Sequence, residues 1–162
     1  MKARRSVLSR LSDEAGANLI EAALVTPLLL LLTFSIVDFG TIFYVHLALE
    51  NGVSQATRYG VTGNQMADPD NDGELLSRED SIKTAMRNAT PTLTLDDDAF
   101  TFSHLPVGGA SWQAGAGGAG DITKVTVRYT WPVMTPVIRP LFDDGEIRMA
   151  VESAMKSESR FE

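Results

Sequence analysis

The sequence predicts an α+β protein in which a long N-terminal helix crosses a membrane and continues into a small head. Two observations predict this architecture: an apolar run near the N-terminus, and a following region with one helical and several alternating segments. The chain has 162 residues, enough for one domain with an appendage. We divide it into a basic cytoplasmic leader at 1–16, a long helix at 17–60 and a head at 61–162.

Charge is unevenly spread along the chain. The net charge is −7, from 14 Lys and Arg against 21 Asp and Glu. Residues 1–16 carry +2, residues 17–45 carry −2 and residues 46–162 carry −7. A basic start, an apolar stretch and an acidic body are typical of a chain inserted in a membrane. The acidic excess argues against a nucleic-acid-binding protein.

Few residues are available for catalysis. Cys is absent, which excludes disulfides, Cys-based metal sites and a Cys nucleophile. The two His residues, His46 and His104, are too few for a His-rich metal centre. A Gly-rich motif at 115–120 lacks the preceding strand and following helix of a dinucleotide-binding loop. We therefore expect that the protein is not an enzyme.

The apolar run predicts a membrane span at about 18–45. The 16 residues from Ala22 to Val37 carry no charge, and apolar character resumes after Asp38. About 20 mainly apolar residues are needed to cross about 30 Å of hydrocarbon. Basic residues before the span predict a cytoplasmic N-terminus, with the head on the far side. Phe39, Phe43 and Tyr44 are placed as an interfacial aromatic belt.

Two other interpretations of this run fit the sequence less well. A buried helix of a soluble protein rarely carries so long an apolar run. A cleavable secretory signal requires a small-residue cleavage site soon after the apolar region, and none follows here. Pro27, in the interior of the helix, predicts a local kink or loosening.

The residues that open the run carry a specific pattern. The segment 16–21 (GANLIE) resembles the processing site of type IV prepilins, which are cut after a Gly so that Glu becomes the fifth mature residue. The wider segment resembles the TadE-like family of Tad pilus proteins. The matching features are Glu21, Pro27 with the Leu run after it, Asp38-Phe39-Gly40 and Arg58-Tyr59-Gly60. The chain departs from the family at Ala22, where an aromatic residue is frequent.

This resemblance implies a membrane-anchored minor pilin or pseudopilin in the inner membrane of a bacterial envelope, with a periplasmic or extracellular head. Prepilin peptidase would cut between Gly16 and Ala17. The implied partners are other pilins or pseudopilins and the pilus assembly platform, and the implied role is assembly or initiation of a Tad-type pilus. Two alternatives stay open: a single-pass membrane protein with a calcium- or ligand-binding head, and a minor pseudopilin of a secretion system.

Two acids interrupt the apolar region. Glu21, near the inner end, is either a tolerated interfacial acid or the partner of a free N-terminal amine that sets register in a filament. The pilin resemblance favours the second interpretation. Asp38 lies about 25 Å further along the helix, near the outer interface. We expect it to be a hydrated acid at headgroup level, with a contact to a partner as the alternative.

An acidic segment follows the long helix. Residues 68–79 match the EF-hand pattern, with Asp68, Asp70 and Asp72 at loop positions 1, 3 and 5, Gly at 6 and Glu79 at 12. The Glu74 carbonyl occupies position 7. This pattern predicts a weak calcium site, and the alternative is an acidic turn before a helix capped by Ser77.

The head is expected to hold one helix and an antiparallel sheet of about three strands. Spacing predicts the helix at 77–89, and alternation predicts strands at 99–105 and 122–131. Residues 146–155 fit either a strand or a helix, and we favour a strand. The outer third of the long helix should pack on this head through Val45, Leu49, Val53, Ala56 and Gly60.

Overall fold

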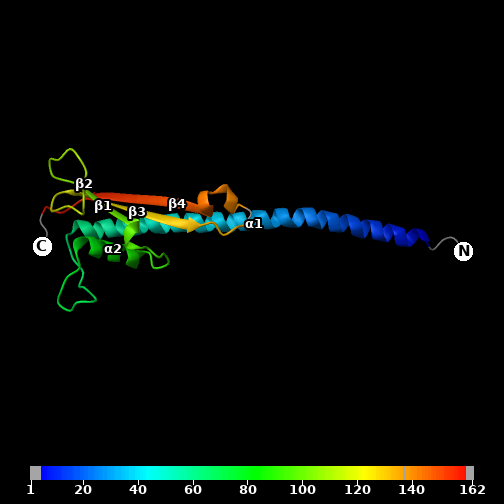
Figure 1. The fold of residues 1–162 in the computed structure, drawn as a ribbon, viewed down its shortest axis with the longest axis horizontal. Helices are drawn as coiled ribbons and strands as arrows, with labels where there is room; N and C mark the ends of the chain where they lie inside the picture. Colours follow the sequence, from blue (N-terminus) through cyan, green and yellow to red (C-terminus); the bar gives the residue numbers. More distant parts are fainter. Residues whose placement is uncertain (1–4, 137, 160–162) are drawn as a thin grey trace.

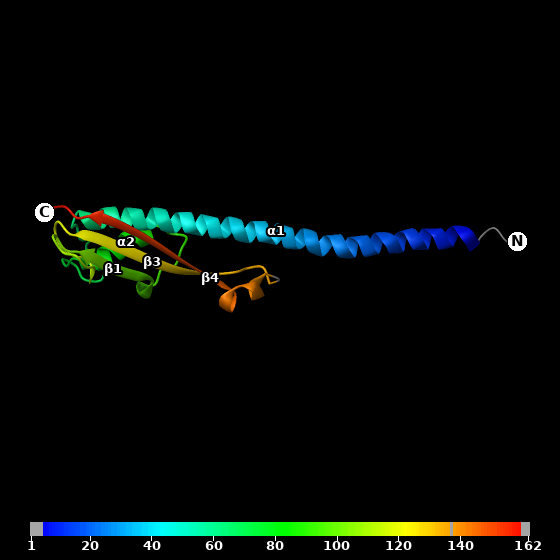
Figure 2. The same ribbon diagram turned by 90° about the horizontal axis from the view of Figure 1, so that it is seen from above.

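The computed structural model describes the backbone of residues 5–136 and 138–159, and the side chains of these ranges from Gly16 onward. It consists of one long helix, α1, with a small head packed along its C-terminal part (Figures 1 and 2). The α+β architecture predicted from the sequence is confirmed.

Helix α1 spans Arg5–Val61 and has 57 residues. It begins before the expected start at about Ala17; the sequence of 5–16 contains no Pro and only one Gly, so little in it opposes a helix. The helix runs without interruption through Pro27. It ends as predicted, followed by Gly63 with a φ of 74°, a conformation that glycine adopts easily.

The C-terminal part of α1 packs on the head with the predicted face. Val45, Leu49, Val53 and Ala56 are buried in the core, and Gly60 is buried beside them. These residues recur at spacings of three and four, so one stripe of the helix faces the head. The sequence therefore predicted correctly which face of the helix the head covers.

Helix α2 spans Arg78–Ala89 and lies against α1. Ser77 caps it, because its hydroxyl oxygen accepts a hydrogen bond from the Asp80 amide. Ile82 and Met86 are buried between the two helices. At Gly52 a Cβ atom would lie 2.5 Å from the Thr90 side chain, so the close approach of the helices requires a glycine there.

The sheet has four strands in the order β2-β1-β3-β4, and all neighbouring pairs are antiparallel. The strands are β1 (Phe100–Leu105), β2 (Gln113–Ala114), β3 (Ile122–Pro132) and β4 (Glu146–Lys156). Residues 146–156 thus form a strand, as we favoured. The expected count of about three strands omitted β2, because two residues inside a Gly-rich segment give no alternation pattern and are fixed only by pairing with β1.

One face of the sheet forms the core with α1 and α2. Phe100, Phe102, Val125, Val127 and Val151 are buried on this face. The segment between β3 and β4 contains two short 3-10 turns, η2 (Arg139–Leu141) and η3 (Asp143–Gly145). A third turn, η1 (Asp97–Ala99), precedes β1. Figures 1 and 2 place η2 and η3 at the end of the head nearest the N-terminal half of α1, and in Figure 2 they stand away from that helix.

Candidate functional site

The N-terminal half of α1 extends beyond the head. Large apolar side chains from Leu19 to Phe34 are exposed. Within the described part of the chain, α1 is the one helix long and apolar enough to cross a membrane, and its most apolar stretch has no residue buried against the head. Exposure of so many apolar residues to water is unfavourable, which makes this half of α1 a candidate membrane span.

The predicted processing residues lie at the start of this stretch. Gly16 and Ala17 are within α1, and no other part of the described structure approaches within 4 Å of the position that a Cβ on Gly16 would take. The side chain of Glu21 is exposed. Glu21 follows Ala17 by four residues, so both lie on the same face of the helix, one turn apart. The exposed Glu21 carboxylate is thus accessible to a partner outside its own chain.

Asp38 is in a different environment from the one expected. Its exposure is only 3%, and its Oδ2 atom accepts a hydrogen bond of 3.0 Å from the backbone N–H of Thr135. The expectation of a hydrated acid is therefore wrong. The reason is tertiary: the segment between β3 and β4 folds back onto α1, buries Val133 and Thr135, and supplies the donor. A buried carboxylate requires such a donor, because an unsatisfied charge is costly.

Residues 67–75, which include most of the acidic segment, form a small hairpin before α2. Asp68 N–H donates to the Glu74 carbonyl at 3.0 Å, and Ala67 bridges to Leu75. The Asp68 carboxylate accepts hydrogen bonds from the Asn71 side chain and the Asp70 amide, which lower the pKa of Asp68. Asp70 and Asp72 are exposed.

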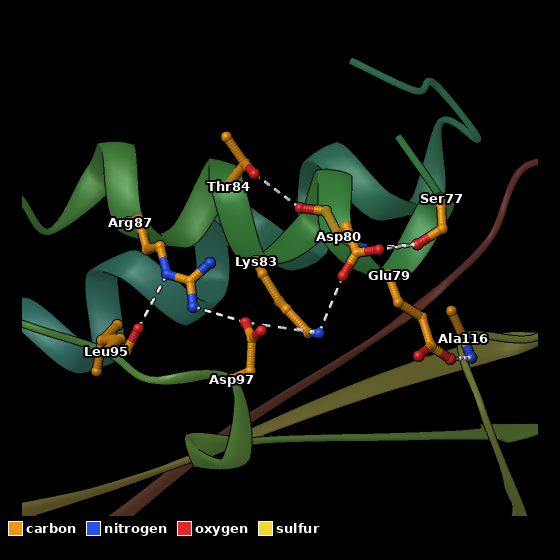
Figure 3. A network of polar contacts seen from close by, with 9 residues as sticks. All are labelled: Ser77, Glu79, Asp80, Lys83, Thr84, Arg87, Leu95, Asp97 and Ala116. Atoms are coloured by element: carbon orange, nitrogen blue, oxygen red, sulfur yellow. Dashed lines mark hydrogen bonds and ion pairs between the residues drawn. The ribbon is translucent and has the colours of Figure 1, made fainter. Parts of the chain in front are cut away.

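Glu79 was predicted at the twelfth position of a calcium loop, but its side chain points away from the loop acids. Its Oε1 atom accepts a hydrogen bond of 3.1 Å from the Ala116 amide in the Gly-rich segment (Figure 3). Among the described residues, no group of three or more Asp, Glu, His or Cys side chains is arranged to hold a metal ion. The Asp68 carboxylate is occupied by the Asp70 amide and the Asn71 side chain, and Glu79 is held by the Ala116 amide, away from the loop. Calcium binding by this loop stays a prediction.

An ion-pair network joins α2 to the segment that precedes β1 (Figure 3). Lys83 Nζ lies 3.0 Å from Asp80 and 3.7 Å from Asp97, and Arg87 donates to Asp97 at 2.8 Å and to the Leu95 carbonyl at 2.9 Å. The hydrogen bond from Arg87 lowers the pKa of Asp97, and that from Ser77 lowers the pKa of Asp80. These contacts hold the chain after α2 against the helix, and we assign them a structural role.

Arg78 is a structural residue that the sequence analysis missed. Its guanidinium donates to the Gly60 carbonyl at the end of α1 and to the Ala116 and Gly117 carbonyls. It also donates to the hydroxyls of Thr123 and Ser157, at 3.2 and 3.1 Å. Burial lowers the pKa of Arg78. Because these partners come from four distant segments, no local sequence signal identifies Arg78 as the residue that joins them.

These features define a class of protein that has one candidate membrane-spanning helix and a small α+β head. The N-terminal half of the helix is uncovered, and its C-terminal part packs against the head. Residues 16–58 match the family model of the TadE-like protein family. The resemblance noted in the sequence is thereby confirmed for this segment, which includes Glu21, Pro27, Asp38 and the helix face that packs on the head. A comparison with curated proteins and one with solved structures each gave no match.

Proposed function

We propose that this protein is a minor pilin or pseudopilin of a Tad-type pilus. In this role it is anchored in the inner membrane of a bacterium by the N-terminal half of α1, with the N-terminus in the cytoplasm and the head outside. Prepilin peptidase removes residues 1–16, and the mature protein takes part in assembly or initiation of the filament together with other pilins and the assembly platform.

The observation that carries this proposal is the TadE-like match on residues 16–58, which coincides with the candidate span and with Glu21. The geometry supports it in one further respect. The Glu21 carboxylate is exposed at the start of an apolar helix that the head leaves uncovered. An acid in that position is costly in lipid unless it is paired, and the amine of a processed neighbouring subunit is a suitable partner.

The proposal is tested in the source bacterium by deleting the gene and counting pili by electron microscopy. Loss or strong reduction of pili is expected, with recovery when the full chain is restored. A C-terminally tagged chain solubilised from membranes should co-purify with pilins. Normal piliation in the deletion strain, with no pilin in the purified material, would contradict the proposal and favour a membrane protein that stays outside the filament. Co-purification with secretion-system components in place of pilins would favour a secretion pseudopilin.

A further inference from the structure

The segment between β3 and β4, at the end of the head nearest the candidate span (Figures 1 and 2), exposes three large apolar side chains. They are Met134, which is 67% exposed, Leu141, which is 79% exposed, and Phe142, which is 39% exposed. We call these three residues the apolar tip. None of the three belongs to the hydrophobic core or to the side chains packed against it.

The position of the tip along α1 follows from the contact with Asp38. Thr135, the residue after Met134, is held on Asp38 by the 3.0 Å hydrogen bond. Glu21 is the last charged residue before the apolar run. A span of about 20 residues that starts just after Glu21 ends near Thr41, and one that starts at Ala17 ends near Ile36. Either placement puts Asp38 and Thr135 at the outer boundary of the hydrocarbon.

The charges around the tip indicate what kind of surface it meets. The described residues of the segment from Val133 to Arg148 contain Arg139 and Arg148 against Asp143, Asp144 and Glu146. Arg148 is within 3.3 Å of Asp144. With charges nearly balanced, attraction to anionic headgroups is weak, and removal of apolar side chains from water is the main favourable contribution.

We propose that the apolar tip inserts into the outer interface of the membrane, so that the head rests on the lipid surface beside its own span. The Asp38–Thr135 contact holds the tip at that level and shields the Asp38 carboxylate from hydrocarbon. The occupant of this surface is therefore lipid, bound through apolar contact and not through headgroup charge. This inference rests on α1 crossing a membrane, as proposed above.

The absence of Cys from the chain allows an unambiguous test. Met134→Cys and Leu141→Cys are each labelled with an environment-sensitive fluorophore in the full chain, reconstituted in phosphatidylcholine nanodiscs. Val107→Cys is the matched control, because Val107 is 73% exposed and belongs to the segment between β1 and β2, at the opposite end of the head (Figure 1). Leu28→Cys, at a 68% exposed position of the apolar run, reports on the span itself.

Labels at 134 and 141 should show blue-shifted emission and lose most of their fluorescence to lipids spin-labelled near the headgroup. The label at 107 should respond only to a water-soluble quencher, and replacing part of the phosphatidylcholine with anionic lipid should change neither result. Suppose that lipid quenches the label at position 28, while the labels at 134 and 141 respond only to the water-soluble quencher, as the label at 107 does. This result would support the membrane span and overturn the inference. If the label at 28 is not quenched, the membrane span fails and the inference fails with it. Quenching at 134 and 141 only when anionic lipid is present would overturn the apolar mode of contact.

Discussion

Asp38 and Thr135 are 97 positions apart in the sequence, yet the backbone N–H of Thr135 donates a 3.0 Å hydrogen bond to the Asp38 carboxylate. Both residues are buried. This contact fixes the segment between β3 and β4 on α1 at the level where the apolar run ends. Asp38 is the only acid between Glu21 and Glu50, and this hydrogen bond helps to fix the position of the head along the helix.

Removing this acceptor should loosen the segment. In Asp38→Ala the Thr135 amide loses its partner, at a cost of about 1–3 kcal/mol for an unsatisfied buried donor. Hydrogen exchange of the peptide that covers 133–135 should be faster in nanodiscs. Asp38→Asn keeps an acceptor oxygen and should stay close to the wild type. Equal exchange rates in all three proteins would show that the hydrogen bond contributes nothing to holding the segment.

Cleavage between Gly16 and Ala17 is the second prediction. Co-expression of the full chain with a prepilin peptidase should shorten it by the first 16 residues, because a Gly precedes a mature N-terminus with Glu at its fifth position. Intact-mass spectrometry measures the loss. Gly16→Leu is the control and should stay uncut. An unchanged wild-type N-terminus beside an active peptidase would favour an anchor that keeps its leader.

Glu21→Gln should separate assembly from membrane insertion. Gln is nearly isosteric but carries no charge, so insertion should not suffer, since removing a charge from an apolar segment lowers its transfer cost. An ion pair with the amine of a neighbouring subunit would be lost, together with the register that it sets. Protein level and membrane fractionation should therefore stay normal while recovery of pilins in a pull-down falls. Normal piliation and co-purification would identify Glu21 as a tolerated interfacial acid.

Calcium binding by the 68–79 loop should be weak. Glu79 must give up its hydrogen bond with Ala116 to reach the loop acids, and Leu76, at position 9, offers no side-chain oxygen. We expect a Kd of about 0.1–1 mM, the range of extracellular modules. Calorimetry on the full chain in detergent measures it. The double variant Asp70→Asn/Asp72→Asn, at two exposed positions, should abolish the signal. No calcium-dependent heat in the wild type at several millimolar would identify the segment as an acidic turn.

Two glycines of α1 should respond oppositely to alanine. At Gly52 a Cβ would lie 2.5 Å from Thr90 Cγ2 and 2.9 Å from Met86 Sδ, so Gly52→Ala should destabilise the head by about 1–3 kcal/mol through overpacking. Around Gly40 nothing lies within 4 Å of that position, so Gly40→Ala should be neutral or gain up to about 1 kcal/mol from helix propensity. Thermal unfolding in detergent measures both. A Gly52→Ala protein as stable as Gly40→Ala would contradict the close packing of α1 on α2.

The sequence by itself determined the elements with strong local signals. The apolar run, the stripe from Val45 to Gly60, the Ser77 cap and the alternation in β3 are each read from neighbouring residues, because helix and strand periods act over a few positions. The same locality explains why the TadE-like pattern around Glu21 is visible in the sequence. For the described residues, these signals were sufficient to place most of the helices and strands.

Only the tertiary structure decided the features made by residues distant in the sequence. Strand β2 exists because Gln113 and Ala114 pair with β1, and Asp38 is buried because Thr135 folds onto it. Glu79 is directed to Ala116, away from the acids that a linear motif groups with it. Arg78 donates a hydrogen bond to Ser157, which is 79 positions away in the sequence. Such contacts depend on how the sheet and helices pack, and this packing leaves no periodic signal in the sequence that a local pattern would detect.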